Sequence, residues 1–353
     1  MRSKTLCITA VALAMPVQAA FKLLALFALL LSFIAAARAD QFTFRTIDFP
    51  GVDSTWGLAI GPRGEIGGLA CVGPSCQGFL LRNGADPVII TPPGASSSYV
   101  TGIQPGGFLL AGQYNDASGN AHGYVLNRLR PGAFTPIDPD PNGVLFTEVA
   151  DMNPSGDLAG WYADLAGIGH GYVVLKGSLT SFDIPGATFS AAFGISPGGD
   201  LVGTYCDAAG CHAYLLRGGI SGALTTIDVP DAAVTDAFGV NSLGQIVGDY
   251  CMVDGTCHGY LRNPDGGLIT VDPPGSSFVI AFAINPAGQI TGLSCDDSGC
   301  HAFLATPQLE PAFQTTTVPT RASGRPPSSS TLDSVRRLRP LGKGGLARLG
   351  SKH

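Results

Sequence analysis

Short runs of β-branched and aromatic residues, separated by Gly, Pro and Asn, fill the chain between residues 44 and 304. Runs of this kind are typical of β-strands. No stretch of this region repeats an apolar residue every three or four positions, as an amphipathic helix does. The pattern therefore predicts an all-β fold.

The runs recur as one long phrase. Residues 238–261, FGVNSLGQIVGDYCMVDGTCHGYL, have close copies at residues 193–216 and 282–304, and looser copies lie further upstream. The repeated His, with Gln77 in its place in the first copy, recurs after 45, 48, 42, 46 and 43 residues. Repeats of about 45 residues that contain strands are typical of propeller blades.

Each repeat contains four candidate strands. We expect strand a at residues 44–49 and again at 224–229, strand b ending at residues 238–240, strand c at 245–250 and strand d at 258–262. The connections from b to c, from c to d and from d to the next a are short enough for hairpins, whereas the connection from a to b is longer. One blade is therefore b, c and d of one repeat with a of the next, which predicts a six-bladed β-propeller.

A His in strand d faces an Asp in the next strand a under this pairing. The expected pairs are His122 with Asp138, His170 with Asp183, His212 with Asp228, and His258 with Asp272. The repeat with Gln77 instead of His is followed by the repeat with Thr91 instead of Asp, which favours the pairing.

His301 is then left with Asp48, at the other end of the repeat region. This predicts that the N-terminal strand closes the ring. Residues 314–318, which carry Thr317 at the Asp position, are the alternative closing strand.

The repeated His and Asp residues are expected to be structural. Five of the six histidines occupy one repeat position, whereas a catalytic residue is needed once. We expect no catalytic residue, no metal site and no cofactor. Calcium in the Asp-rich loops is the alternative, although an Asp-x-x-Gly turn supplies few of the six to eight oxygen ligands that calcium takes.

Eight cysteines lie in the repeats as close pairs. We expect four disulfides across hairpin ends, with Cα atoms about 4.4 to 6.8 Å apart: Cys71 with Cys76, Cys206 with Cys211, Cys251 with Cys257, and Cys295 with Cys300. Zinc is the competing interpretation, but the pairs belong to different repeats.

The first 39 residues have the features of a secretory signal peptide. Lys22 precedes an apolar run at residues 23–36, and cleavage is expected between Ala39 and Asp40. The alternative is an uncleaved anchor, but the run is shorter than the roughly 20 residues that span a bilayer. No other apolar span is found in the mature chain, so we expect a secreted or periplasmic protein.

Charge divides the mature chain into two parts. Residues 40–306, the predicted propeller, contain 24 acidic and 8 basic residues, a net charge of −16. Residues 307–353 contain 8 basic and 2 acidic residues and little bulky apolar content, which predicts a disordered basic tail. An acidic body repels phosphate backbones, so nucleic acid is not an expected partner.

The repeats share the motif Gly-x-Asn-x-x-Gly-x-x-x-Gly followed by His-Ala-Phe or His-Gly-Tyr. The His-Ala-Phe part is found at His301-Ala302-Phe303. It resembles the bacterial extracellular HAF-repeat family, named for His-Ala-Phe. The resemblance covers residues 44–304. It implies export and a propeller-like fold, and it brings no catalytic residue or ligand. Gln77 departs from the motif, and the second and third copies lack the cysteine pair.

The leading hypothesis for function is an exported binding or scaffolding propeller that recognises glycan or envelope protein, and we expect a monomer. An enzyme of lyase or glycosidase type and a purely structural surface protein are the alternatives. An enzyme would gather unusual polar residues at one channel mouth. The candidates are Trp56, Arg63, Glu148, Asp151 and Trp161.

Overall fold

A computed structural model describes residues 41–130, 133–140 and 143–308 of the chain. The predicted signal segment with its Ala39/Asp40 junction, the alternative closing strand at 314–318 and the tail from residue 309 lie outside the described residues. All regular secondary structure in the described ranges is β-strand, which confirms the all-β prediction. Within these ranges no helix is long and apolar enough to cross a membrane.

The strands in chain order are β1 (Phe42–Ile47), β2 (Ser54–Ile60), β3 (Ile66–Val72), β4 (Ser75–Leu81), β5 (Val88–Ile90), β6 (Ser97–Ile103), β7 (Leu109–Asn115), β8 (Ala121–Asn127), β9 (Phe134–Ile137), β10 (Phe146–Met152), β11 (Leu158–Ala163), β12 (Gly169–Leu175), β13 (Ser178–Phe182), β14 (Phe189–Ile195), β15 (Leu201–Cys206), β16 (Cys211–Arg217), β17 (Ala223–Ile227), β18 (Ala232–Val240), β19 (Ile246–Met252), β20 (Cys257–Arg262), β21 (Leu268–Thr270), β22 (Phe278–Ile284), β23 (Ile290–Asp296) and β24 (Gly299–Pro307).

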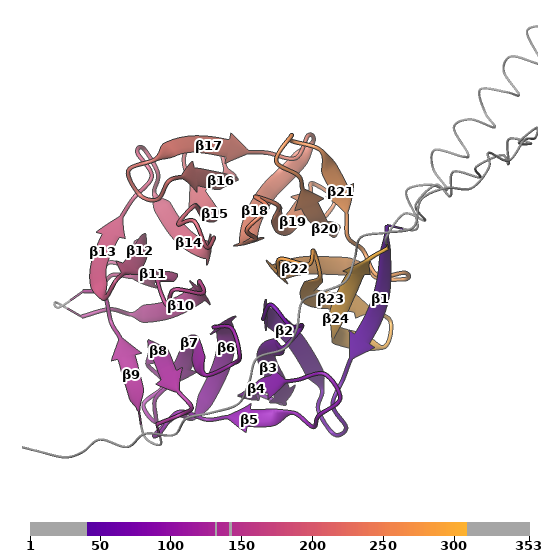
Figure 1. Ribbon diagram of the computed structural model, residues 1–353. Coiled ribbons are helices and arrows are strands. Elements are labelled where there is room, and N and C mark those ends of the chain that lie inside the picture. The colour runs from indigo at the N-terminus through magenta and orange to yellow at the C-terminus, as the bar shows by residue number, and fades with distance from the viewer. Residues whose placement is uncertain (1–40, 131–132, 141–142, 309–353) are drawn as a thin grey trace, which may run out of the picture. The chain divides into compact units, whose positions relative to one another are not determined.

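Consecutive strands pair antiparallel in sets of four around a central space (Figure 1). We call each set a module and name it by its innermost strand: the β2 module (β2–β5), the β6 module (β6–β9), the β10 module (β10–β13), the β14 module (β14–β17), the β18 module (β18–β21) and the β22 module (β22–β24 with β1). Strand d of each repeat pairs with strand a of the next, as the connection lengths predicted.

The N-terminal strand completes the β22 module. β1 pairs with β24 over six residue pairs, which include Phe44 with Ala305 and Ile47 with Ala302. The expected neighbours of the first strand are therefore found, although the strand begins and ends two residues earlier than predicted. Asp48 follows the strand instead of lying inside it.

Hydrogen bonds divide the modules into a 16-stranded and an 8-stranded sheet. Single parallel bridges, such as Ser54 with Cys300 between β2 and β24, join modules within each sheet. No such bridge joins the β2 module to the β6 module. At this junction Ser98 Oγ accepts from Gly78 N at 3.0 Å and donates to Ile90 O at 2.6 Å.

A fully buried aromatic ring on strand d marks the core of every module. These rings are Phe79, Tyr124, Tyr172, Tyr214, Tyr260 and Phe303. The Tyr214 hydroxyl donates to Ala191 O on the innermost strand at 2.9 Å. Gly203 lies between them, and a Cβ added there would be 2.0 Å from that carbonyl oxygen. The repeated glycine of strand c is thus required for this close approach.

Candidate functional site

All six innermost strands carry a β-bulge at the same repeat position. In β14, for example, the register shifts between Ala192 and Gly194, which leaves Phe193 as the extra residue. A bulge turns a side chain away from the regular alternation of the strand. The bulged residues are Leu58, Thr101, Ala150, Phe193, Phe238 and Phe282.

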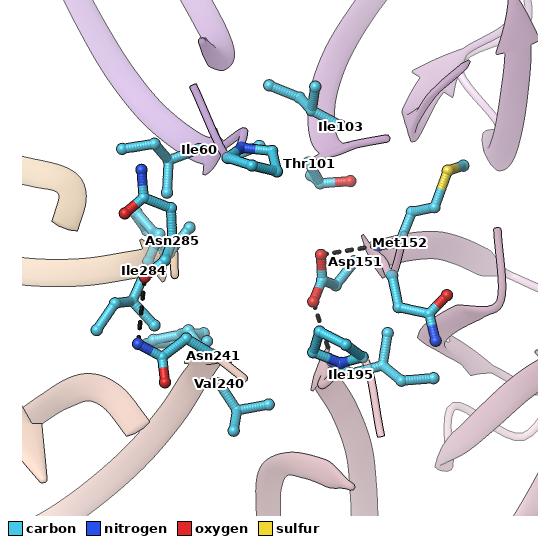
Figure 2. A pocket seen from close by; sticks show the side chains of 18 of the residues that line it. Ile60, Thr101, Ile103, Asp151, Met152, Ile195, Val240, Asn241, Ile284 and Asn285 are labelled. Atoms are coloured by element: carbon cyan, nitrogen blue, oxygen red, sulfur yellow. Dashed lines mark hydrogen bonds between the residues drawn. The ribbon is translucent and has the colours of Figure 1, made fainter. Parts of the chain in front are cut away.

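These six bulged residues line a pocket at the centre of the modules (Figure 2). Prolines from the turns that follow the innermost strands, such as Pro62 and Pro154, also line it. The pocket has a volume of about 80 Å³. One water needs about 10–15 Å³, so the pocket admits several waters or the end group of a larger ligand.

Aromatic rings form one part of the pocket wall. The rings of Phe193 and Phe238 have their centroids 5.1 Å apart, and those of Phe238 and Phe282 are also 5.1 Å apart. Trp56 continues the series by stacking on Phe282 at 6.4 Å. We call these four residues the aromatic arc. β2, β6 and β10 form the rest of the wall. β6 and β10 carry the smaller side chains of Thr101 and Ala150 and the carboxyl of Asp151.

Asp151 is the one titratable side chain that lines this pocket in the described part of the chain. Its carboxylate points into the pocket (Figure 2), where Oδ2 accepts from Ile195 N at 2.9 Å and Oδ1 from Met152 N at 2.7 Å. The other innermost strands have Gly or Ala at this position: Ala59, Gly102, Gly194, Gly239 and Ala283.

Burial sets the charge of Asp151. The surrounding protein raises the pKa of its carboxyl to about 6, although the two backbone N–H groups lower the pKa in part. The carboxyl therefore changes between donor and acceptor near neutral pH. It is the group in the pocket that can form strong directional contacts with a ligand.

Glu148 and Trp161 form a separate contact further along β10 and β11. Trp161 Nε1 donates to Glu148 Oε2 at 3.0 Å, and burial raises the pKa of Glu148 to about 7. Neither residue lines the central pocket, and neither does Arg63. The five unusual residues noted in the sequence are thus not gathered at one place. Asp151 lies in the pocket, and Trp56 stacks on one of its lining residues.

Side-chain amides join neighbouring modules around the pocket. Asn241 Nδ2 donates to Asn285 O at 3.1 Å (Figure 2), and Asn285 Nδ2 donates to Gly61 O at 3.2 Å. Gln104 Nε2 likewise donates to Pro154 O at 3.2 Å. These bonds explain the Asn of the repeat motif, and they fix the turns that surround the pocket.

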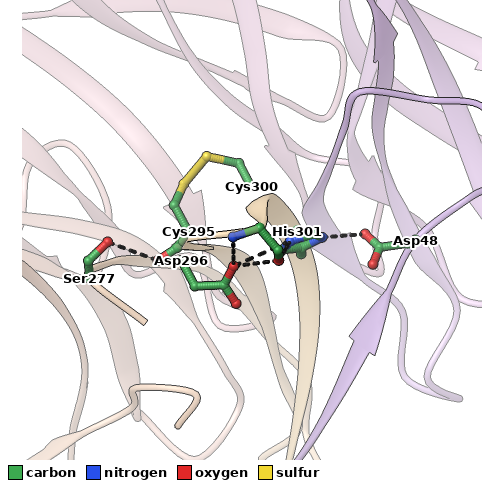
Figure 3. Close-up of a disulfide and its surroundings, with 7 residues drawn as sticks. Asp48, Ser277, Cys295, Asp296, Cys300 and His301 are labelled. Atoms are coloured by element: carbon green, nitrogen blue, oxygen red, sulfur yellow. Dashed lines mark hydrogen bonds and ion pairs between the residues drawn. A yellow bond between two sulfur atoms is a disulfide. The ribbon is translucent and has the colours of Figure 1, made fainter. Parts of the chain in front are cut away.

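The repeated histidines lie far along the modules, on their outer hairpins. The Nδ1 atom of each lies close to an Asp carboxylate: His122 to Asp138 at 3.2 Å, His170 to Asp183 at 2.9 Å, His212 to Asp228 at 2.8 Å, His258 to Asp272 at 2.7 Å, and His301 to Asp48 at 2.9 Å. Figure 3 shows His301 between Asp48 and Asp296. Its Nε2 lies 3.8 Å from Asp296.

His170 shows the electrostatic effect of this arrangement. Burial lowers the pKa of its imidazole, but hydrogen bonds and charge from Asp183 and Asp164 outweigh burial, so the pKa is raised. Asp272 contacts the imidazole of His258 and also accepts from Gly259 N at 3.0 Å.

The four expected disulfides are present, with each cysteine directly opposite its partner on paired strands. Figure 3 shows the bridge between Cys295 and Cys300. The Cα separations are 4.0 to 4.1 Å, which is shorter than the predicted range of 4.4 to 6.8 Å. Directly opposed residues of an antiparallel pair that exchange no hydrogen bonds approach more closely than most disulfide partners do.

Potential metal ligands in the described ranges come together at one place, Asp249 with Cys251 and Cys257. The two sulfurs are joined to each other, so they are not thiolate ligands. Asp249 lies opposite Asp236 in the strand register, and Asp249 Oδ1 has no hydrogen-bond partner. Burial and the nearby charge of Asp236 raise the pKa of Asp249 to about 8.

Comparison with known proteins identifies the fold. No family model matches the sequence, and no curated protein matches it. A TolB structure from Agrobacterium tumefaciens has a TM-score of 0.50 at 16% identity, and the match covers 72% of this chain and 91% of that one.

Two further structures match less closely. TolB from Acinetobacter baumannii has a TM-score of 0.46 at 15% identity, with 60% of this chain covered, and this chain spans about half (53%) of its length. The β-propeller domain of the Trilobed protease from Pyrococcus furiosus has a TM-score of 0.45 at 9% identity and covers 73% and 94% of the two chains. The β-propeller prediction is confirmed. The HAF-repeat resemblance finds no support from a family model.

Proposed function

We propose that the chain is an exported, monomeric binding protein, a six-bladed propeller closed by β1, whose central pocket holds the end group of a glycan. The observation that carries the proposal is Asp151. It places one half-buried carboxyl in the pocket where the other innermost strands have Gly or Ala, beside an arc of aromatic rings.

Two pairings support the closed ring. β24 pairs with β1 along one edge, and Cys300 on β24 also forms a parallel bridge with Ser54 on β2. The amide of Asn285 adds a bond from the β22 module to Gly61 of the β2 module. The last module is therefore tied to the first by both backbone and side-chain bonds.

The pocket chemistry suits a sugar end group. Aromatic rings pack against the apolar faces of sugar rings, and a carboxyl hydrogen-bonds to their hydroxyl groups. With a pKa of about 6, the Asp151 carboxyl accepts from a hydroxyl at pH 7 and donates to one in mild acid. The pocket volume of about 80 Å³ favours one terminal group over a whole chain segment.

Binding is favoured over catalysis by the number of acids. Glycoside hydrolysis generally uses two carboxyls on either side of the scissile bond. Among the described residues, Asp151 is the only acid that lines the pocket. Glu148 lies outside the pocket and is hydrogen-bonded to Trp161. A propeller enzyme remains the alternative, for which the raised pKa of Glu148 is the supporting observation. A purely structural protein is the other alternative.

Export is supported by the disulfides. Bridges of this kind form and persist in oxidising compartments, which include the periplasm and the outside of the cell. The signal peptide at residues 1–39 and membership of the HAF-repeat family belong to this proposal. No cofactor is required by it.

The test is a glycan array followed by calorimetry on the exported chain. We expect at least one glycan to bind, and Asp151→Asn to weaken its Kd about tenfold or more, since a hydrogen bond to a charged group contributes roughly 1.5–3 kcal/mol. Asp297→Asn, at an exposed Asp, is the matched control and should leave the Kd unchanged. Equal binding by wild type and Asp151→Asn would overturn the proposal. Release of shortened glycans would favour the enzyme instead.

A further inference from the structure

Cationic side chains are few in this acidic body, and they are unevenly placed. Residues 40–306 contain eight Lys and Arg residues against 24 acids. Half of the eight lie at the adjoining parts of the β22, β2 and β6 modules: Arg45, Arg63, Arg82 and Arg128. The other four cations are Arg130, Lys176, Arg217 and Arg262.

Two adjoining hollows are lined by three of these arginines, Arg45, Arg63 and Arg82. The first, of about 380 Å³, lies between Arg45 and Arg82. The second, of about 400 Å³, is lined by Arg63, Arg82 and the ring of Phe108. Both hollows share Arg82 and Asn83, so together they form one continuous surface, which we call the arginine surface.

The guanidinium groups have no carboxylate partners. Every ion pair in the described ranges joins a His to an Asp, and none includes an Arg. Arg82 Nη2 and Arg128 Nη1 donate to the backbone oxygens of Gly106 and Gly107, at 3.5 and 3.1 Å. The Arg63 side chain has no hydrogen bond within these ranges.

Burial lowers the pKa of Arg128, and the charge of Arg82 lowers it further. One acid, Glu65, also lines the second hollow. Its Oε2 accepts from the backbone N–H of Arg63 at 3.1 Å, and the side chain is buried, so it is engaged in its own turn. The surface thus holds three arginines and one acid, and none of these arginines forms an ion pair with a carboxylate in the described ranges.

We propose that the arginine surface binds an acidic saccharide, an oligosaccharide that carries carboxylates on its sugar rings. A guanidinium pairs with a carboxylate through two parallel hydrogen bonds. Phe108, which is 47% exposed, offers an apolar face to a sugar ring beside Arg63. The Asn83 amide lies between the two hollows, within reach of sugar hydroxyls.

Charge complementarity also selects against denser polyanions. The net charge of −16 on the body repels a long phosphate chain, whereas a short saccharide with one charge per ring contacts only the arginine surface. This surface is separate from the central pocket. The inference therefore does not depend on the glycan proposed for Asp151.

Calorimetry on the exported chain tests the proposal, with oligogalacturonate as the probe and the neutral galactose oligomer of equal length as its counterpart. We expect oligogalacturonate to bind and the neutral oligomer to bind at least tenfold more weakly. Raising the salt from about 50 to 200 mM should weaken the oligogalacturonate Kd several-fold, because exposed charges are screened.

Variants locate the site. Arg82→Gln and Arg63→Gln should each weaken oligogalacturonate binding about tenfold, and Phe108→Ala should weaken it while leaving the weak binding of inorganic phosphate unchanged. Arg217→Gln is the matched control, because Arg217 is the last residue of β16, occupies the same repeat position as Arg82 and is exposed. It should stay within twofold of wild type.

Two results would overturn the proposal. One is equal affinity for the charged and neutral oligomers, and the other is oligogalacturonate binding that Arg82→Gln and Arg217→Gln reduce alike. Tighter binding of polyphosphate than of oligogalacturonate would also overturn it, in favour of a general anion site. Asp151→Asn should leave oligogalacturonate binding intact, which separates this outcome from failure of the central-pocket proposal.

Discussion

Ala213 lies on β16 with no exposed surface, in the apolar cluster that contains Leu215 and Ile227. Tyr214 and Leu216, which alternate with Ala213 and Leu215 along the strand, belong to a different cluster on the other face. The small side chain is therefore part of the packing between two layers. A larger side chain at this position would find no free space.

We predict that Ala213→Leu lowers the free energy of unfolding by about 1–3 kcal/mol, because it overpacks a close contact. Urea denaturation monitored by tryptophan fluorescence measures the change. Leu224→Ala, at an exposed leucine of β17, is the control and should stay within about 0.5 kcal/mol. An unchanged midpoint for Ala213→Leu would show that the position has more room than its burial indicates.

Asp249 makes stability depend on pH. Its pKa is raised to about 8 in the folded protein, while the carboxyl of the unfolded chain has a pKa near 3.8. The folded state thus keeps a proton that the unfolded state releases between these values. This group lowers the free energy of unfolding as the pH rises from 4 to 8, and the loss levels off above pH 8.

We predict that Asp249→Asn removes part of this loss and stabilises the protein at pH 8 relative to pH 5, by on the order of 1–3 kcal/mol. Urea midpoints of wild type and variant at both pH values give the result. Asp86→Asn, at an exposed Asp, should shift neither curve. A wild-type stability that rises steadily from pH 5 to pH 8 would contradict the assignment to Asp249.

Residue roles were predictable only where the repeat itself carried the signal. The Gln77 and Thr91 substitutions pointed to the His–Asp contacts because both changed together. Asp151 stood out as a departure from the repeat. The sequence did not show that the Phe193 side chain points into the pocket. That orientation depends on the bulge, and a bulge is defined by pairing with the partner strand.

Hairpins between strands c and d form with and without cysteines. In the β6 module, which has no cysteine pair, Asp116 Oδ1 accepts from Ser118 N and Asn120 N at 2.8 and 2.9 Å. In the β14 module the corresponding Asp207 accepts from Ala209 N at 2.7 Å, and a disulfide is present as well. The Asp side chain builds the turn, and the disulfide adds to it.

We predict that the double variant Cys206→Ser/Cys211→Ser folds normally and loses about 2 kcal/mol, the chain-entropy effect of closing a loop of about six residues. Thermal melting and urea titration give the difference. Reduction of all four bridges should lower the melting temperature further without unfolding the protein at 25 °C. Complete unfolding of the double variant would mean that the bridge holds more than its own hairpin.

Strand positions followed from the sequence, but strand ends did not. β18 ends at Val240 as predicted, whereas β1 ends at Ile47, before the expected residue 49. The difference has a local cause, since Asp48 uses its side chain to contact His301 and Pro50 cannot donate to a ladder. Turn residues thus set the ends more strongly than apolar pattern does.

The whole molecule depends on its first strand. Phe42 is buried among residues of the β18 and β22 modules, and Ile47 is buried among residues of the β22 and β2 modules. β1 covers the outer edge of β24. Each buried side chain of this size contributes roughly 1.5–3 kcal/mol.

We predict that deletion of residues 42–50, behind an intact export signal, lowers the free energy of unfolding by at least about 3 kcal/mol. Truncation after Gln308 is the control and should change it little. Urea denaturation of the two exported proteins makes the comparison. Equal stability of the two deletions would show that β1 is not needed to complete the fold.

The pairing of β1 with β24 also determines how long the first strand waits for its partner during synthesis. Asp48 and His301 are 253 residues apart, so the first strand to be synthesised receives its partner last. At roughly 5–20 residues per second, synthesis separates the two strands by about 10–50 s. Throughout this interval Phe42 and Phe44 belong to an unpaired strand, which is a template for pairing with another copy. Until β24 emerges, the incomplete protein therefore exposes an edge at which another copy can pair.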